Sequence, residues 1–194
     1  MSVGKVLIIG GSGFVSGTLA RVACDQGCEV WAVPRGQKPL PKGVVPLRAD
    51  RKDAAAFKAA VIGAGVCWDL VVDCIGYDIG DARQDLDVFP TLAKHLVFIS
   101  TDFVFDPARR RFPQPFDNPA TVTDDTYGGK KRRCELEFLQ AATGDMRWTV
   151  FRPCHIYGPG SELGCLPDAC RVPGLLRKIR AGDPIQLVGG GHFL

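Results

Sequence analysis

A chain of 194 residues is long enough to form one domain with a full hydrophobic core and needs no metal or disulfide staples. Apolar residues make up 46% and charged residues 23%, which excludes an intrinsically disordered chain and a fibrous repeat. The net charge is only +3, and the longest apolar runs fall far short of the ~20 residues that a membrane span requires. Because the first residues also lack the pattern of a signal peptide, we expect a cytoplasmic protein that does not act at a membrane.

The cysteines and histidines do not predict a disulfide scaffold or a metal site. Disulfide scaffolds are usually shorter than ~100 residues. The eight cysteines contain no C-x-x-C pair, and the three histidines are scattered away from them. We therefore expect reduced thiols and no bound metal.

Six apolar runs alternate with helix-like segments along the chain. The runs are nearly continuous, as is typical of strands that are covered on both faces. In chain order they are KVLIIG (5–10), CEVWAV (28–33), VVPLRA (44–49), DLVVDCIG (69–76), HLVFIST (95–101) and RWTVFRP (147–153). Val15, Leu19 and Val22 share a helical face between the first two runs, and Asp53 can cap a helix after the third. The alternation predicts an α/β protein with a doubly wound, Rossmann-like parallel sheet that binds ligands at the carboxyl ends of its strands.

Two segments of the chain are less regular. Pro90 should kink or restart the helix that Leu86 and Phe89 begin, so the boundary of this helix stays open. The segment FDPARRRFPQPFDNPATVTDD (105–125) is rich in turn-forming residues and predicts a long loop over the site.

The first strand runs into IIGGSGFVSG (8–17), a glycine-rich turn that opens a helix. Gly10 and Gly13 begin and end this turn, with Gly11 and Ser12 inside it, and free N–H groups at the positive end of a helix favour a pyrophosphate. Many loops contain such glycines, but the position between a strand and a helix favours a nucleotide. Ser16 stands where a third glycine would be expected.

The loops after the second and third strands bear on the choice of cofactor. An acid after the second strand would hold the ribose of NAD, whereas an arginine there would neutralise the extra phosphate of NADP. The chain has Arg35 and no acid, so we expect NADP or NAD with NADP preferred, the alternative being that Arg35 is an ordinary surface residue. Asp50 and Arg51 fall where an adenine edge would lie, although Asp50 is equally suited to a turn.

TYGGKK (126–131) places Tyr127 and Lys131 four residues apart, on one face of the helix before the sixth strand. An ammonium beside a phenol lowers the pKa of the phenol towards a value useful for proton transfer at neutral pH. Thr101, at the end of the fifth strand, can hold a carbonyl or alcohol oxygen of a substrate. Two glycines inside a helix cost stability, and we expect Gly128 and Gly129 to leave room for cofactor and substrate. The alternative is a packed tyrosine beside a surface lysine.

The glycine turn, ISTDFVFD, YGGKK and FRPCHIYGPG stand in the order and spacing of the extended short-chain dehydrogenases, the NAD-dependent epimerase/dehydratase family. The chain resembles this family over nearly all of its length. STDFVFD looks most like dTDP-4-dehydrorhamnose reductases, whereas DRKD and WDLVVDCIGY look more like an atypical branch that includes chloroplast stem-loop RNA-binding relatives. The subfamily therefore stays open.

The resemblance implies roles for particular residues. Thr101, Tyr127 and Lys131 match the family's catalytic Ser/Thr, Tyr and Lys, and Lys131 would also bind the nicotinamide ribose. The implied cofactor-binding residues are Gly10, Ser12, Gly13, Phe14, Val15, Arg35, Asp50, Arg51, Cys74, Ile75, Gly76, Tyr127, Lys131, Pro153 and His155. His155 is given no chemical role, because a lone histidine is more often structural.

Family members continue beyond LVGGGHFL (187–194), so we expect a chain truncated within its substrate lobe. Residues 1–160 would form the NAD(P)-binding Rossmann-like domain and 161–194 the start of an incomplete substrate-binding lobe, most of which would be missing.

The resemblance implies an oxidoreductase or epimerase acting on a sugar-nucleotide-like carbonyl or alcohol, and a homodimer is possible. The alternatives are a binding protein with an RNA or protein partner and a truncated product that binds cofactor without turnover. The basic clusters ARRRF (108–112) and KKRRCE (130–135) are compatible with RNA, but at so small a net charge we expect solvated surface and no nucleic acid.

Overall fold

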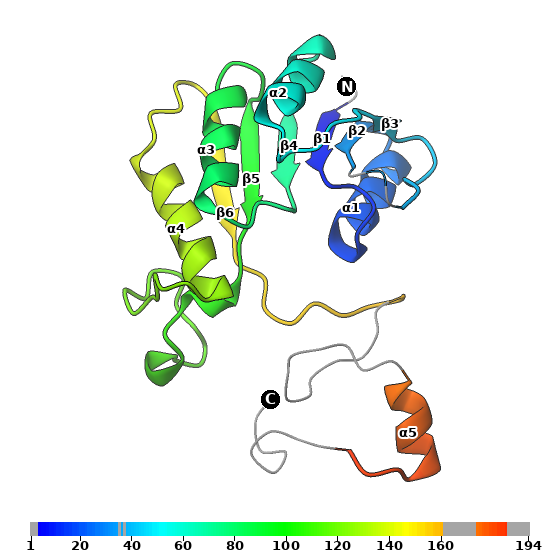
Figure 1. Ribbon diagram of the computed structural model, residues 1–194, viewed down its shortest axis with the longest axis vertical. Helices are drawn as coiled ribbons and strands as arrows, with labels where there is room; N and C mark the ends of the chain where they lie inside the picture. Colours follow the sequence, from blue (N-terminus) through cyan, green and yellow to red (C-terminus); the bar gives the residue numbers. More distant parts are fainter. Residues whose placement is uncertain (1–3, 35, 37, 161–173, 186–194) are drawn as a thin grey trace. The chain divides into compact units, whose positions relative to one another are not determined.

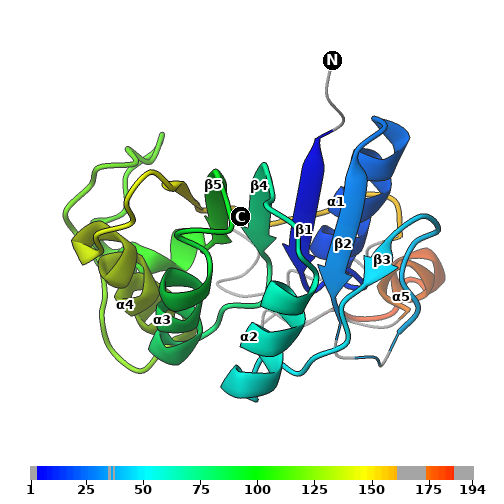
Figure 2. The same cartoon turned by 90° about the horizontal axis from the view of Figure 1, so that it is seen from above.

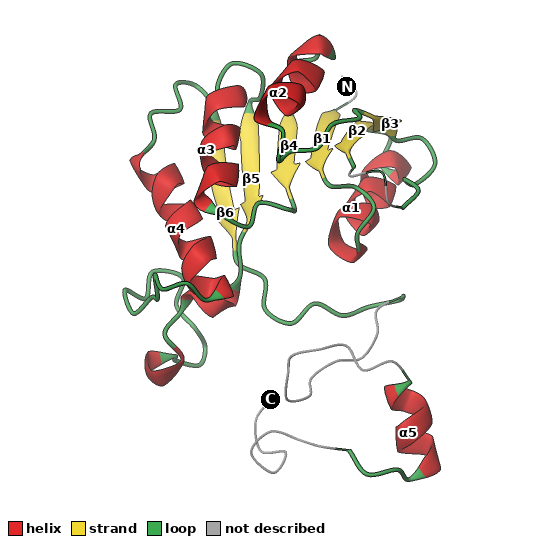
Figure 3. Cartoon of the chain, viewed as in Figure 1, coloured by secondary structure: helices red, strands yellow, loops and turns green. Residues whose placement is uncertain are grey.

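The computed structural model describes residues 4–34, 36, 38–160 and 174–185. Within these residues the chain forms one parallel sheet of six strands in the order β3-β2-β1-β4-β5-β6 (Figure 1, Figure 3). The strands are β1 (Lys5–Ile9), β2 (Glu29–Val33), β3 (Val45–Pro46), β4 (Leu70–Asp73), β5 (His95–Ile99) and β6 (Arg147–Phe151). This order, with β1 at the point where the winding direction changes, confirms the predicted doubly wound sheet.

Helices cover both faces of the sheet. The helices of the sheet unit are α1 (Phe14–Asp25), α2 (Ala54–Gly63), α3 (Ile79–Val88) and α4 (Tyr127–Gln140), with the short 3₁₀ helices η1 (Asp102–Val104) and η2 (Pro107–Arg109) after β5. Helix α1 lies on one face, whereas α2, α3 and α4 lie on the other (Figure 2). This arrangement follows from right-handed crossovers that run in opposite directions from β1.

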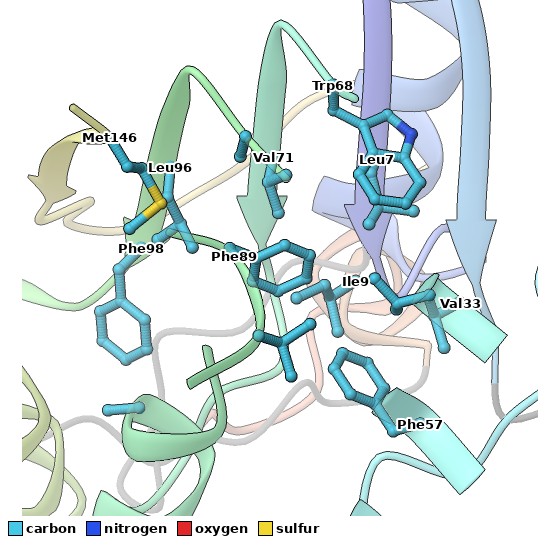
Figure 4. Close-up of a cluster of buried hydrophobic side chains, with 14 of the residues drawn as sticks. Leu7, Ile9, Val33, Phe57, Trp68, Val71, Phe89, Leu96, Phe98 and Met146 are labelled. Atoms are coloured by element: carbon cyan, nitrogen blue, oxygen red, sulfur yellow. The ribbon is translucent and has the colours of Figure 1, made fainter. Parts of the chain in front are cut away.

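Successive side chains of a strand point to opposite faces, and each face builds its own core. Leu7 and Ile9 of β1 enter the larger cluster beneath α2, α3 and α4 (Figure 4). Val6 and Ile8 enter a smaller cluster with Ala20 of α1. The larger cluster includes edge-to-face aromatic pairs, of which Trp68–Phe89 has ring centroids 6.4 Å apart and Phe57–Phe89 6.3 Å. Such pairs add to the stabilisation from buried apolar area.

Side-chain caps fix where the helices begin. The carboxylate of Asp53 accepts a hydrogen bond from the Ala56 amide at 3.0 Å, which confirms the predicted cap of α2. Asp78 caps α3 and Thr126 caps α4 in the same way. Helix α3 ends at Val88, just before Pro90, in agreement with the expected break.

The third strand is shorter than its apolar run predicts. Only Val45 and Pro46 pair with β2, although the Leu47 amide still donates to the Ala32 carbonyl at 2.8 Å. Proline has no N–H to donate, so Pro46 is accommodated here at the edge of the sheet.

The chain divides into two compact units, residues 1–154 and 155–194. The first unit contains the whole sheet, and the described part of the second contains helix α5 (Leu175–Ala181). The domain boundary expected at residue 160 stays a prediction. Across the described residues, no helix combines the length and apolar character that crossing a bilayer requires.

Candidate functional site

Four neighbouring strands send their carboxyl ends to one edge of the sheet. The glycine turn follows β1, Cys74–Gly76 follows β4, Thr101 follows β5 and Pro153 follows β6. The sheet therefore brings together segments that are far apart in the sequence, at the edge where doubly wound proteins bind their ligands.

The glycine turn needs its glycines for two reasons. Gly10 and Gly11 have φ values of +120° and +101°, which other residues rarely adopt. A Cβ at Gly11 would also overlap the side chain of Ala32 on β2. The turn is held by the Gly10 amide, which donates to the Val33 carbonyl at 3.0 Å. These features place the turn directly against β2.

Ser16 has a local role at the position where a third glycine was expected. Its hydroxyl accepts a hydrogen bond from the Gly13 amide at 3.0 Å, so the side chain caps the turn. A Cβ at Gly17 would lie 3.4 Å from the Gly11 carbonyl oxygen, an ordinary contact, so the packing does not require glycine at this position. Phe14 and Val15 begin α1, and the positive end of a helix dipole favours anions.

Two cavities share the segment 39–41 as a wall, and only the first of them borders the turn, from which it extends along α1. One, of about 400 Å³, is lined by Gly11, Ser12 and Gly13 together with the segment 39–42. The other, of about 740 Å³, lies beyond the carboxyl ends of β2 and β3, and Lys38, Arg48 and Asp50 line it. The turn and the cavities fit a dinucleotide, because they combine a cradle that side chains would fill with the positive end of a helix and space for an adenosine. Arg35 lies outside the described residues.

Asp50 and Arg51 point in different directions. Asp50 is exposed, and its carboxylate accepts from the Lys52 amide at 2.9 Å, as a turn residue would. Arg51 is 4% exposed and its guanidinium contacts Asp73 at 2.8 Å and Asp85 at 3.0 Å. This differs from the predicted adenine-facing position, because carboxylates from β4 and α3 draw Arg51 inward.

The ion-pair cluster around Arg51 is buried beneath the edge of the sheet that carries the glycine turn. Its guanidinium also contacts Asp81 at 3.2 Å. Burial alone would lower the pKa of Arg51, but Asp73, Asp85 and Asp81 raise it above its ordinary value. Burial and the neighbouring charge of Asp73 raise the pKa of Asp85 well above its usual range. One guanidinium therefore holds several buried carboxylates together.

The segment Cys74–Gly76 packs directly against Asp73 of this cluster. The Ile75 amide donates to Asp73 at 2.8 Å. A Cβ at Gly76 would overlap the carboxylate of Asp73 and the ring of Phe98, so only glycine fits. Burial, reinforced by Asp73, raises the pKa of the Cys74 thiol to about 12, which makes it a poor nucleophile.

Lys131 is buried at the centre of the site. Its side chain is 1% exposed, and its ammonium donates to the carbonyls of Gly76, at 2.6 Å, and Ile99. The ammonium also lies 4.6 Å from the centre of the Phe98 ring and 5.4 Å from that of Tyr77. Burial lowers the pKa of Lys131. The lysine therefore joins α4 to the ends of β4 and β5.

Tyr127 is the first residue of α4 and is half-exposed, with its ring edge-on to Phe103 at 6.4 Å. Burial, followed by the neighbouring phenol of Tyr77, raises the pKa of Tyr127. The sequence predicted a lowered pKa, and that prediction was wrong for the unliganded protein. The physical reason is that burial of the phenol disfavours its charged form, while the Lys131 ammonium is directed to the carbonyls of Gly76 and Ile99.

The two glycines after Tyr127 are close to protein rather than to open space. A Cβ at Gly128 would overlap the carbonyl of Phe103 in η1, and one at Gly129 would overlap Asp124 before the helix cap. The expected room for ligand is thus occupied by the chain itself. The glycines instead let α4 begin directly against η1, which places Tyr127 beside Phe103.

Thr101 is buried, and its hydroxyl accepts from the Phe103 amide at 3.3 Å as the cap of η1. The neighbouring Ser100 donates to Glu135 at 2.6 Å. Sequence reasoning missed Glu135, which is 1% exposed and binds Arg152. The available signal was its position one helical turn after Lys131, on the inner face of α4.

The remaining predicted cofactor-binding residues, Pro153 and His155, come after β6. The carbonyl of Pro153 accepts from the Asp102 amide at 3.1 Å, which ties this segment to η1. His155 is exposed and belongs to the second unit. Among the residues that the structure describes, no group of three or more His, Cys, Asp or Glu side chains is arranged to hold a metal ion.

The fold and this edge define a Rossmann-like α/β protein with a dinucleotide-type turn. The chain belongs to the NAD dependent epimerase/dehydratase family, whose model matches residues 86–193. The family predicted from the sequence is thereby confirmed.

Two curated proteins show the range of the relatives. The chain is 26% identical to the chloroplast stem-loop binding protein of 41 kDa b of Arabidopsis thaliana over 96% of its own length and 50% of the relative. It is 27% identical to a 2-alkyl-3-oxoalkanoate reductase of Stenotrophomonas maltophilia (strain K279a) over 96% of its length and 59% of the relative. The chain thus spans little more than half of the curated relatives it matches.

Solved structures agree with the fold. The enzyme WbmG of Bordetella bronchiseptica, in complex with NAD and UDP, superposes with a TM-score of 0.74 at 20% identity, covering 95% of this chain and 62% of WbmG. A putative NAD-dependent epimerase/dehydratase from Methylobacillus flagellatus gives a TM-score of 0.63 at 28% identity, covering 93% and 59%. These similarities support the same sheet and crossover pattern.

Proposed function

We propose that the protein is an NAD(P)-dependent oxidoreductase or epimerase that acts on a sugar-nucleotide-like carbonyl or alcohol. The observation that carries the proposal is the position of Thr101, Tyr127 and Lys131 at the same sheet edge as the glycine turn. The solved relatives WbmG, bound to NAD and UDP, and MoeE5, bound to UDP-glucose and NAD, support this substrate class.

Different residues of the chain would bind the cofactor, orient the substrate and transfer the proton. Amides of the glycine turn bind the pyrophosphate, and the backbone of Cys74–Gly76 lines the other half of the cofactor. The nicotinamide, when bound, supplies or accepts the hydride. Thr101 orients the substrate oxygen with its hydroxyl, and Tyr127 transfers the proton at its phenolic oxygen. Because the pKa of Tyr127 is raised, the phenol is protonated at neutral pH and is suited to donate to a carbonyl oxygen.

Lys131 supports this step mainly by position. Its ammonium already binds the carbonyls of Gly76 and Ile99, so the side chain is ordered before any ligand arrives. Lys131 would donate to a ribose hydroxyl of the bound cofactor in place of one of these carbonyls, and its charge would then favour the phenolate of Tyr127. The proposal therefore places activation of the phenol in the complex rather than in the free protein.

The cofactor is proposed to be a nicotinamide dinucleotide, and the family description names NAD. The preference for NADP depends on Arg35, which lies outside the described residues, and it stays a prediction. Lys38 and Arg48 line the cavity beyond β2 and β3 and add positive charge there. Tighter binding of NAD(H) than of NADP(H) in parallel titrations would reverse the preference.

Two measurements test the proposed function. A saturating dinucleotide should raise the melting temperature, because a ligand that binds only the folded state stabilises it. In a form of the protein that turns over substrate, Tyr127→Phe should abolish turnover and leave dinucleotide binding nearly intact. Undiminished turnover in this variant would show that Tyr127 does not transfer the proton. An unchanged melting temperature with NAD(H) and NADP(H) would contradict the proposed cofactor.

A binding protein without turnover is the second candidate. It is favoured by the engagement of Lys131 with main-chain carbonyls and by the raised pKa of Tyr127, which leave the phenol unactivated in the free protein. The relative that is named a stem-loop binding protein makes a nucleic acid the partner to examine. Dinucleotide binding without any change in the pKa of Tyr127 would favour this candidate over the enzyme.

A further inference from the structure

The long loop between β5 and α4, which Figure 1 draws in green, is closed at its base and held by a contact from the segment after β6. Phe105 and Thr121 form an antiparallel bridge, and the Asp106 amide donates to the Ala120 carbonyl at 2.9 Å. Arg152 donates to the Phe116 carbonyl at 2.8 Å. The loop is therefore a preformed surface rather than an unconstrained connection.

A groove of about 610 Å³ runs along this loop, and three consecutive arginines line it with one carboxylate, that of Asp117. Arg109 binds Asp106 at 2.8 Å, and Arg110 contacts Asp102 at 3.3 Å. Arg111 is exposed, and its guanidinium has no ion pair or hydrogen bond among the described residues. The Arg111 guanidinium is thus available to bind a ligand.

Two further donors of the groove lack acceptors. The Nε of Arg110 and the Nδ2 of Asn118 are shielded from water and have no hydrogen-bond partner in the described part of the chain. Both residues line the groove. Buried donors are nearly always paired, so leaving these two without acceptors costs free energy. Because both atoms are shielded, an acceptor oxygen in the groove would reach them only after their side chains shift.

We propose that this groove binds the phosphate group of a small molecule, at a site separate from the glycine turn. Guanidinium groups match phosphate oxygens through paired hydrogen bonds, and the Asn118 amide adds a neutral donor. The glycine turn follows β1, whereas the groove belongs to the loop after β5, so the two sites use different segments.

The charge of the loop favours a single phosphate over a polymer. Affinity for a nucleic-acid backbone grows with the number of phosphates that are neutralised. Here Arg109 and Arg110 are already paired with aspartates, which leaves the charge of Arg111, and the whole chain has a net charge of only +3. The site therefore suits one oxyanion.

Titration of inorganic phosphate into the full ¹⁵N-labelled chain tests the proposal residue by residue. We expect saturable shifts of the Arg110 Nε–H and Asn118 side-chain amide signals. The backbone amides of Gly11 and Gly13 report separately on the glycine turn, so the outcome does not depend on dinucleotide binding. Shifts confined to these glycines, or no saturable shift, would overturn the proposal.

Three variants sharpen the result. Arg111→Gln should weaken phosphate binding by about tenfold or more, the effect of losing a hydrogen bond to a charged group. Asn118→Asp keeps the oxygen that accepts from the Ala120 amide but replaces the donor by a carboxylate, and should abolish binding. Arg147→Gln removes an exposed arginine of β6 and serves as the matched control, with unchanged affinity expected. Equal affinities of Arg111→Gln and the unchanged chain would contradict the site.

A single-stranded RNA 12-mer forms the second arm of the experiment. Weak binding of this RNA beside saturable phosphate binding supports the small-molecule site. RNA binding that exceeds phosphate binding, falls steeply with salt and is lost in Arg111→Gln would replace the small ligand by a nucleic acid.

Discussion

Arg152 binds both carboxylate oxygens of Glu135, through Nε at 2.8 Å and Nη2 at 2.7 Å. Ser100 and Arg132 donate to the same carboxylate, at 2.6 and 2.8 Å. These contacts connect the inner face of α4, one turn after Lys131, with the segments that follow β5 and β6. The carboxylate thereby fixes the helix that presents the predicted catalytic residues.

Glu135→Gln should lower the free energy of unfolding by roughly 2–3 kcal/mol, because the arginines lose their counter-ion and one acceptor becomes a donor. We place the loss below the full cost of an uncompensated buried charge, since Arg152 is 20% exposed and Arg132 18%. Urea unfolding measures the change. Glu137→Gln, on the outer face of α4 where Glu137 pairs with exposed Arg83, is the control and should change stability little. Equal effects of the two changes would refute the structural role of Glu135.

Arg51→Gln should cost more, about 3–5 kcal/mol, because Asp73 and Asp85 would be left buried without their cation. Lys58→Gln breaks an exposed pair with Asp87 and should cost less than about 1 kcal/mol. Denaturant unfolding of both variants at pH 7 gives the comparison. A small effect at Arg51 would mean that the carboxylates take up protons instead, which a steeper pH dependence would reveal.

Asp85→Asn should make the protein relatively more stable as pH rises. Burial and Asp73 raise the folded-state pKa of Asp85, so the stability from binding this proton is complete below the unfolded pKa, about 3.9, and is lost as pH rises through the folded pKa. Asparagine does not titrate and can still accept from Arg51. The stability of the variant relative to the unchanged chain should therefore increase between pH 4 and pH 8.

Unfolding curves at several pH values test this sign. Asp87→Asn, an exposed position on the same helix, should show no comparable increase. A difference at Asp85 that stays constant with pH, or falls as pH rises, would show that Asp85 is ionised at low pH in the folded protein.

The sheet could be predicted from the sequence because its strands are continuous apolar runs, and the glycine turn because its position between a strand and a helix is local information. The inward direction of Arg51 could not, since Asp73, Asp81 and Asp85 are 22 to 34 residues away and meet it only through the crossover. A partial signal existed in α3, where Asp81 and Asp85 share a helical face with buried Ala82 and Val88.

The site shows the same division between local and tertiary information. The spacing of Tyr127 and Lys131 places them on one side of α4, as predicted. The spacing says nothing about which acceptors the ammonium finds, and these are the carbonyls at the ends of two other segments. Glu135 escaped notice because its partner Arg152 lies 17 residues further along the chain, beyond the next strand.

The last prediction concerns the glycines of TYGGKK, where the effect of Gly→Ala on helix propensity and its effect on packing have opposite signs. In an open helix, Gly→Ala stabilises by up to about 1 kcal/mol. At Gly128 the new methyl group would overlap the Phe103 carbonyl, and overpacking of this kind costs about 1–3 kcal/mol. We therefore expect Gly128→Ala to lower stability and to move the start of α4, with weaker dinucleotide binding as the second consequence.

Gly63→Ala is the matched control, because Gly63 closes helix α2 and an added methyl group there would have nothing within 4 Å, so this change should raise the melting temperature. Thermal unfolding of both variants decides the question, and a dinucleotide titration separates a local shift of Tyr127 from a general loss of fold. If Gly128→Ala were as stabilising as Gly63→Ala, α4 would not begin against η1, and the placement of Tyr127 beside Phe103 would have to be given up.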